Sequence, residues 1–137
     1  MTVFQNEQPA TIASATKPKL VFVIEPDEST RGVLRHLETE NNIVLFPTKQ
    51  EAIKYCLTAK PDLVISAGTL DDRSKGVDFL SSGEVLETGA KRILMSGSVK
   101  PADLPQDIAF LAKPFRAEQF LSAIKNALDG KGREPNQ

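Results

Sequence analysis

Three side chains that can bind charged groups each follow a short apolar run of the sequence: Glu25, Ser96 and Lys113. A carboxylate, a hydroxyl and an ammonium brought together could contact a phosphoryl group. Transfer of that group to the protein would also need a nucleophile. Another apolar run ends at Ala67, and its methyl side chain cannot act as a nucleophile. We therefore expect a site that binds and signals and does not react.

The elements that must position these residues alternate between strand and helix patterns. Continuous β-branched and aromatic runs predict five strands buried on both faces, at 20–24, 43–46, 63–67, 92–95 and 108–111. Helical spacing predicts a helix ending near residue 38 and further helices at about 49–59, 77–87 and 117–128. We predict an α/β fold, a doubly wound, flavodoxin-like sheet of five parallel strands. Ligands of such sheets bind at the carboxyl ends of the strands, where all four residues above fall.

Each predicted helix carries an apolar stripe that should face the sheet. The stripes consist of Val33, Leu34 and Leu37 in the first helix, Ala52, Ile53, Cys56 and Leu57 in the second, and Phe120, Leu121, Ile124 and Leu128 in the last. The fourth crossover is abnormal, because only about ten residues separate Ser98 from Ile108 and they include Pro101 and Pro105. We expect a shortened or irregular fourth helix there, or a loop.

This order of elements and residues resembles the receiver domain of two-component response regulators, the CheY-like family. The resemblance covers roughly residues 19–128, and its most specific parts are the run 61–65 and the segment 110–115, Phe-Leu-Ala-Lys-Pro-Phe. It implies that an aspartate at the third strand end accepts phosphate from a histidine kinase. Two acids after the first strand would hold Mg²⁺, and a hydroxyl and a lysine would contact the phosphoryl group. Movement of that hydroxyl and rotation of an aromatic residue would then switch the domain.

Carried over residue by residue, the match is partial. The matching positions are the first acid Glu25, the hydroxyl Ser96, the aromatic Phe110, the lysine Lys113 and the proline of a cis peptide, Pro114. Pro26 stands at the position of the second acid, and Ala67 stands at the acceptor position. Ser96 could equally be an ordinary strand-end hydroxyl, and Phe110 fits static core better than a moving switch.

The loss of two carboxylates changes the charge balance of the predicted pocket. Lys113 would find only Glu25 or Asp27 as an obvious partner, so we predict a Glu25–Lys113 ion pair in place of a metal-centred network. Glu25 with backbone carbonyls, such as that of Thr69, would make a poor Mg²⁺ site, so we predict no cofactor and weak or absent Mg²⁺ binding. Asp27 fits a helix cap as well as a member of this degenerate acidic pocket.

Other chemically capable side chains fit ordinary roles better. Asp71 and Asp72 lie beyond Ala67 in a polar loop, which is typical of a solvated turn. His36 is the only histidine and is expected on an exposed helix face, where it has no phosphotransfer partner. Cys56 is the only cysteine, which excludes an internal disulfide, and it is expected to pack as a small core hydrophobe.

Composition narrows the function classes. The chain of 137 residues is predicted to hold one domain at 19–129, with a flexible leader at 1–18 and a flexible tail at 130–137. Lys plus Arg number 17 and Asp plus Glu number 18, so positive and negative charges nearly cancel. The overall charge therefore does not favour binding to nucleic acid or to a membrane surface. The single cysteine and the lack of an apolar signal sequence suit the cytoplasm.

Two interpretations of function remain, with a third disfavoured. The first is a non-enzymatic pseudo-receiver that binds a protein partner, such as a histidine kinase, an output domain or another signalling protein, through a surface near Pro101, Leu104, Phe115 and Phe120. A homodimer through the last-helix face is a further arrangement that the sequence allows. The second is a true phospho-receiver in which Ala67 is an engineered block or Asp71 is a substitute acceptor. A flavodoxin-like enzyme is disfavoured, because no Gly-rich phosphate loop and no Ser-His-Asp set is present.

Overall fold

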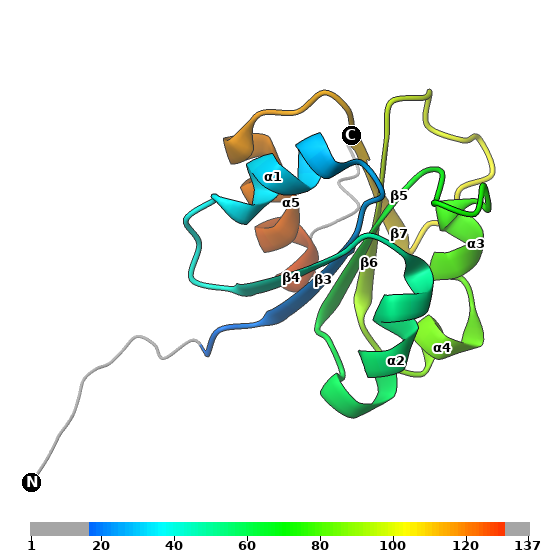
Figure 1. Ribbon diagram of the computed structural model, residues 1–137, viewed down its shortest axis with the longest axis horizontal. Helices are drawn as coiled ribbons and strands as arrows, with labels where there is room; N and C mark the ends of the chain where they lie inside the picture. The colour runs from blue at the N-terminus through cyan, green and yellow to red at the C-terminus, as the bar shows by residue number, and fades with distance from the viewer. Residues whose placement is uncertain (1–16, 131–137) are drawn as a thin grey trace, which may run out of the picture.

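The five apolar runs form the five strands of one parallel sheet. In the computed structural model, which describes residues 17–130, the strands are β3 (Leu20–Ile24), β4 (Asn42–Phe46), β5 (Leu63–Ala67), β6 (Lys91–Ser96) and β7 (Ile108–Ala112). Their order across the sheet is β4-β3-β5-β6-β7, and every neighbouring pair is parallel. The predicted fold class is confirmed (Figure 1). The predicted leader and tail lie almost entirely outside the described residues.

Within residues 17–130, five helices cover the two faces of the sheet. They are α1 (Glu28–Arg35), α2 (Lys49–Ala59), α3 (Gly76–Leu80), α4 (Gly83–Leu86) and α5 (Ala117–Leu128). Figure 1 shows α1 and α5 on one face and α2, α3 and α4 on the other. Side chains of each strand alternate between the two faces, so the core forms two apolar clusters, one on either side of the sheet. Among the described residues, no helix is both long enough and apolar enough to cross a membrane.

The predicted third helix is wrong as a single element, because it is broken at Ser81 and Ser82. The backbone N–H and the side-chain hydroxyl of Ser82 both donate to the carbonyl of Phe79, at 3.0 and 2.6 Å. A serine hydroxyl that takes up a helix carbonyl competes with continuation of the helix. The first helix also ends earlier than predicted, at Arg35 instead of near residue 38.

The fourth crossover contains no helix, so of the shortened helix and the loop that its two prolines allowed, the structure has the loop. Residues 97–107 form turns, including hydrogen bonds from Leu104 N–H to the Pro101 carbonyl at 3.2 Å and from Ile108 N–H to the Pro105 carbonyl at 3.0 Å. Leu104 packs against the core cluster on the face where a fourth helix would lie. One side chain therefore supplies part of the cover that a helix would otherwise give.

Two predicted core residues are exposed instead. Val33 in α1 and Leu57 in α2 point to solvent, whereas their neighbours Leu34 and Cys56 are buried. Successive helix positions differ by about 100°, so a stripe that includes adjacent residues can bury only one of the two fully. Phe120, in the first turn of α5, was expected to contact a partner. It is fully buried in the core instead.

Candidate functional site

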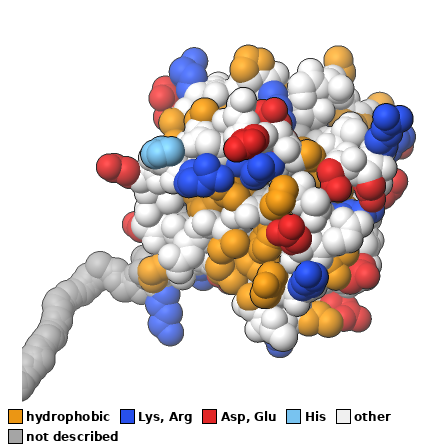
Figure 2. Space-filling view, viewed as in Figure 1, with side chains coloured by type: hydrophobic (Ala, Val, Ile, Leu, Met, Phe, Trp, Pro, Cys, Tyr) orange, Lys and Arg blue, Asp and Glu red, His pale blue; other side chains and the backbone are white. Residues whose placement is uncertain are grey.

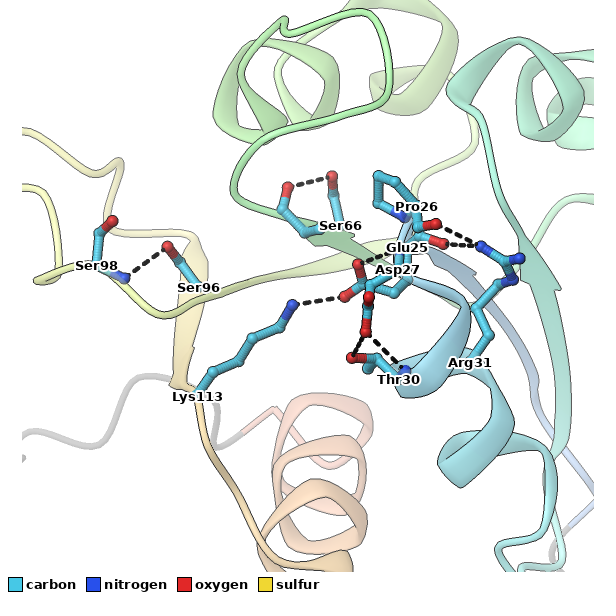
Figure 3. Close-up of polar contacts among 10 residues, drawn as sticks. Glu25, Pro26, Asp27, Thr30, Arg31, Ser66, Ser96, Ser98 and Lys113 are labelled. Atoms are coloured by element: carbon cyan, nitrogen blue, oxygen red, sulfur yellow. Dashed lines mark hydrogen bonds and ion pairs between the residues drawn. The ribbon is translucent and has the colours of Figure 1, made fainter.

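The sheet register brings the predicted residues to one edge. Ile24 pairs with Ser66, Ala67 with Met95 and Ser96 with Ala112, so Glu25, Ala67, Ser96 and Lys113 follow or end four adjacent strands. Figure 3 shows this edge with Glu25 and Lys113 pointing toward one another. The prediction that these positions lie together is confirmed.

The predicted Glu25–Lys113 ion pair is present. Lys113 Nζ donates to Glu25 Oε1 at 2.6 Å, although 88 residues separate the two in the sequence. Glu25 is only 2% exposed, and its second carboxylate oxygen accepts a hydrogen bond from the Asp27 N–H at 3.0 Å. Both carboxylate oxygens of Glu25 are thus engaged by the protein itself. The Lys113–Pro114 peptide is cis, as the resemblance implied.

Asp27 serves as the cap of α1. Its Oδ2 accepts hydrogen bonds from the N–H and the hydroxyl of Thr30, at 2.9 and 2.7 Å. These bonds to Thr30, with smaller effects from the charges of Lys113 and Arg31, hold the pKa of the Asp27 carboxyl below its ordinary value. Of the two roles left open by the sequence, the structure supports the helix cap.

Arg31 is a site residue that the sequence pattern does not single out. Its Nη1 donates to the carbonyls of Glu25 and Pro26, both at 2.8 Å (Figure 3). A guanidinium therefore occupies the acceptors of the segment where the resemblance placed metal-holding acids. The available signal was its spacing, six residues after Glu25 on a short helix, but a lone arginine in a first helix has many ordinary roles.

The residues at this edge do not fit Mg²⁺. The ion takes oxygen ligands, usually including one or two carboxylates. Here Glu25 is the one buried carboxylate, it already accepts from Lys113 and Asp27, and neither Pro26 nor Ala67 offers a side-chain oxygen. Within residues 17–130 no group of three or more His, Cys, Asp or Glu side chains could hold a metal.

Ala67 is enclosed by the loop that follows it. The residue is 3% exposed, and the loop returns to the strand end through a hydrogen bond from Gly76 N–H to the Gly68 carbonyl at 2.8 Å. A Cβ atom at position 76 would lie 1.9 Å from the Ala67 carbonyl oxygen, so this close return requires glycine. Ser66 donates its hydroxyl to the same carbonyl at 2.9 Å. The acceptor position is thus closely surrounded by backbone.

Ser96 forms a local contact and does not join the ion pair. Its hydroxyl oxygen accepts from the Ser98 N–H at 3.1 Å and packs against Gly68, and Figure 3 shows it directed toward Ser98. Its backbone carbonyl accepts from the Lys113 N–H at 2.9 Å. Phe110, opposite Leu94 in the register, is partly buried against the core cluster that also contains Ile108. Both residues match the ordinary roles weighed from the sequence.

The other acidic candidates lie in a turn. Asp72 accepts hydrogen bonds from the N–H and hydroxyl of Ser74 and pairs with Lys49 at 3.3 Å. These contacts, chiefly those with Ser74, lower the pKa of Asp72 to about 2. Asp71 is exposed in the same turn. His36 is exposed too, with Nδ1 2.8 Å from the Gly32 carbonyl oxygen on its own helix.

The prediction of a partner surface is wrong for one of its four residues, Phe120. Phe120 is fully buried and stacks on Phe115 with ring centroids 5.4 Å apart, because it lies on the core side of α5. Pro101, Leu104 and Phe115 are partly exposed. Phe115 also lines a cavity of about 510 Å³ with Pro114 and the exposed Val33. Cys56 is buried as predicted, and burial raises the pKa of its thiol.

Comparison with known proteins adds a fold assignment. No protein-family model matches this sequence, and no curated protein matches it. The beryllofluoride-activated NtrC4 receiver domain dimer is similar in structure, with a TM-score of 0.70 and 24% identity over 82% of this chain and 98% of that chain. The receiver domain of an HD domain-containing protein from Pseudomonas fluorescens Pf-5 gives 0.69 and 20% over 83% and 97%. The REC domain of the PhyR response regulator of Erythrobacter litoralis gives 0.69 and 22% over 85% and 94%. The chain therefore has the fold of CheY-like receiver domains.

Proposed function

We propose that this chain is a degenerate receiver domain that acts as a phosphorylation-independent protein-interaction module in two-component or phosphorelay signalling, and that it is not an enzyme. The observation that carries the proposal is the 2.6 Å Glu25–Lys113 ion pair beside Ala67. The lysine that would contact a phosphoryl group is already neutralised by the acid that would hold the metal. No carboxylate stands at the end of β5 to accept the group.

Three features support a state that does not depend on phosphate. Ala67 is buried, so the strand end is packed and holds no nucleophile. The Ser96 hydroxyl bonds to Ser98, and Phe110 packs against the core. The switch positions implied by the resemblance are therefore held by local contacts. Weak or absent Mg²⁺ binding is part of the same proposal, because Glu25 is already engaged on both oxygens.

The partner is proposed to be a protein, such as a histidine kinase, an output domain or another signalling protein in the cytoplasm. The surface proposed for it lies on the helix-free fourth crossover and the segment before α5, around Pro101, Leu104 and Phe115. Val99 on that crossover is almost fully exposed. The crossover is the part of this chain that departs most from a strand–helix alternation, which makes it the natural place for partner specificity.

Incubation with a small phosphodonor and Mg²⁺, followed by intact-mass measurement, tests the proposal. The wild-type chain should gain no phosphoryl group, and Ala67→Asp should gain little, because Pro26 and the Glu25–Lys113 pair remain. The matched variant Ala67→Asp with Pro26→Asp restores both missing carboxylates and serves as the positive control. A phosphoryl group mapped to Asp71 of the wild type would overturn the proposal, and strong labelling of Ala67→Asp alone would favour a receiver with one altered residue.

A further inference from the structure

The strand β4 lies at an open edge of the sheet. It pairs with β3 on one side, and no described residue pairs with it on the other. An unpaired strand edge presents free backbone N–H and C=O groups and is a template for another strand. Natural edges are usually protected by charged residues, by proline within the strand or by a covering element. The sequence of β4, Asn-Ile-Val-Leu-Phe, contains neither charge nor proline.

The hydrogen bonds to β3 show which groups of β4 are free. Asn42 N–H donates to the Lys19 carbonyl and the Phe46 carbonyl accepts from Glu25 N–H, both at 2.9 Å, so these residues direct their backbone toward β3. Backbone direction alternates along a strand. Ile43 and Leu45 therefore direct their N–H and C=O groups away from the sheet. The free edge offers two donors and two acceptors, one of each from either residue.

This set is complementary to itself. If a second β4 runs antiparallel with Val44 on a twofold axis, Ile43 of one copy faces Leu45 of the other. Each such pair exchanges two hydrogen bonds, because residues of a hydrogen-bonded antiparallel pair bond reciprocally. All four free groups of each edge are then satisfied by one symmetric contact. Pro47, which follows the strand and has no N–H, ends the ladder at this length.

The side chains on both faces of this edge are apolar and partly uncovered. On the α2 face, Val44 is 37% exposed, and Tyr55, which stacks on Phe46 at 6.1 Å, is 51% exposed. On the α1 face, Ile43 and Leu45 pack beside Leu37 and line a cavity of about 610 Å³. Figure 2 shows hydrophobic side chains gathered in the middle of the face over which β4 and α2 lie in Figure 1. A second copy would cover these groups with their own symmetry mates, Val44 against Val44.

We propose that this edge is a homodimer interface, in which two copies join their sheets through antiparallel β4–β4 pairing centred on Val44. The proposal concerns a surface away from the Glu25–Lys113 edge and does not depend on the proposed function. It also differs from the last-helix dimer that the sequence allows.

Sedimentation of the full 137-residue chain over a concentration series, with amide hydrogen exchange at each concentration, tests it. The expected result is a monomer–dimer equilibrium in which protection of the Ile43 and Leu45 amides rises with concentration. Val44→Lys should raise the dissociation constant by about tenfold or more, because two ammonium groups would face each other on the axis. Leu86→Lys is the matched control at another exposed aliphatic residue, away from β4, and should leave the equilibrium unchanged.

A second variant tests the register directly. In a non-hydrogen-bonded antiparallel pair the Cα atoms are about 4.5 Å apart, within the range of about 4.4–6.8 Å that a disulfide spans. Val44→Cys should therefore form a covalent dimer on mild oxidation, and Leu86→Cys should not. A chain that stays monomeric at all concentrations, or a dimer that survives Val44→Lys, would overturn the proposal. Ile43 and Leu45 amides protected in the monomer would overturn it too, because the occupant of the edge would then lie within the same chain.

Discussion

At the scale of single residues, Glu25 binds groups of the protein itself where the resemblance implied a metal ion. A buried carboxylate needs a cation or several donors, and Glu25 obtains Lys113 and the Asp27 N–H. The sequence could predict this pair, because the motif around Lys113-Pro114 and the acid after the first strand both belong at one sheet edge. It could not predict that Arg31 would take the Glu25 and Pro26 carbonyls, because that contact depends on side-chain direction.

Removal of either partner should show which charge is the more costly to leave alone. Lys113→Met should lower the free energy of unfolding by about 3 kcal/mol, because it leaves the carboxylate of Glu25 buried without its cation. Glu25→Gln should cost less, about 1–2 kcal/mol, because the Lys113 side chain is 26% exposed and can reach water. Urea unfolding of both variants and of the double variant gives the coupling. An additive double variant would show that the two groups do not interact.

The turn after β5 carries a pH-dependent contact. The pKa of Asp72 is lowered to about 2 in the folded chain, against about 3.9 for an unperturbed aspartate. Its stabilising contribution is therefore complete above about pH 4 and is lost as the pH falls from there toward 2. Ser74→Ala should raise the Asp72 pKa toward its ordinary value in a carboxyl NMR titration. Ser82→Ala, a serine outside this turn, should not change it.

At the scale of elements, the strands and the second and last helices follow from local pattern, and the break in the third crossover does not. The runs at 20–24 and 63–67 and the helices at 49–59 and 117–128 have the predicted bounds, because period and burial are strong signals over these lengths. The break between α3 and α4 was missed, since it arises from the hydroxyl of Ser82 bonding to Phe79. The prediction that Phe120 contacts a partner is also wrong. Phe120 belongs to the apolar stripe of α5 that faces the core, so its side chain is not available at the surface.

Substitution by alanine should change the stability of the domain in opposite directions at two glycines, Gly83 and Gly76. Gly83 begins α4, and an added Cβ would meet nothing within 4 Å, so Gly83→Ala should raise stability by about 0.5–1 kcal/mol. Gly76→Ala should lower stability, because its Cβ would collide with the Ala67 carbonyl. Thermal unfolding of the two variants measures both effects. A stabilising Gly76→Ala would contradict the close return of the loop to β5.

Arg92 joins the irregular fourth crossover to the rest of the fold. It is a buried cation on β6 that donates to the Leu80 carbonyl at the end of α3, at 3.1 Å, and pairs with Asp107 just before β7. Arg92→Met should destabilise the domain by about 1–3 kcal/mol, because the Leu80 carbonyl loses a charged donor in a buried position.

Asp107→Asn provides the comparison, since Asp107 is 71% exposed and water can take over part of its contact when the carboxylate is removed. In chemical denaturation, Asp107→Asn should lower the free energy of unfolding by less than Arg92→Met does. Equal losses would indicate that the ion pair, and not the contact to Leu80, accounts for the role of Arg92.

At the scale of the whole molecule, the fold could be predicted because five apolar runs alternate with helices and three of them end beside side chains that can bind charged groups. The free edge of β4 does not follow from its own residues, since an apolar strand sequence looks the same at the edge and in the middle of a sheet. The strand order β4-β3-β5-β6-β7 shows that this strand is unpaired on its outer side among the described residues. The molecule thus presents two separate features: a site edge closed by an ion pair, and a sheet edge with free hydrogen-bonding groups.

The most direct test of the central claim is an NMR titration of the amide resonances with beryllofluoride and Mg²⁺. Beryllofluoride mimics a phosphoryl group bound to a carboxylate, so a chain with Ala67 and an engaged Glu25 should show unchanged resonances for Ser96, Phe110 and Lys113. The variant with Ala67→Asp and Pro26→Asp shows that the reagent is active. Saturable shifts at those three residues in the wild-type chain would contradict the account.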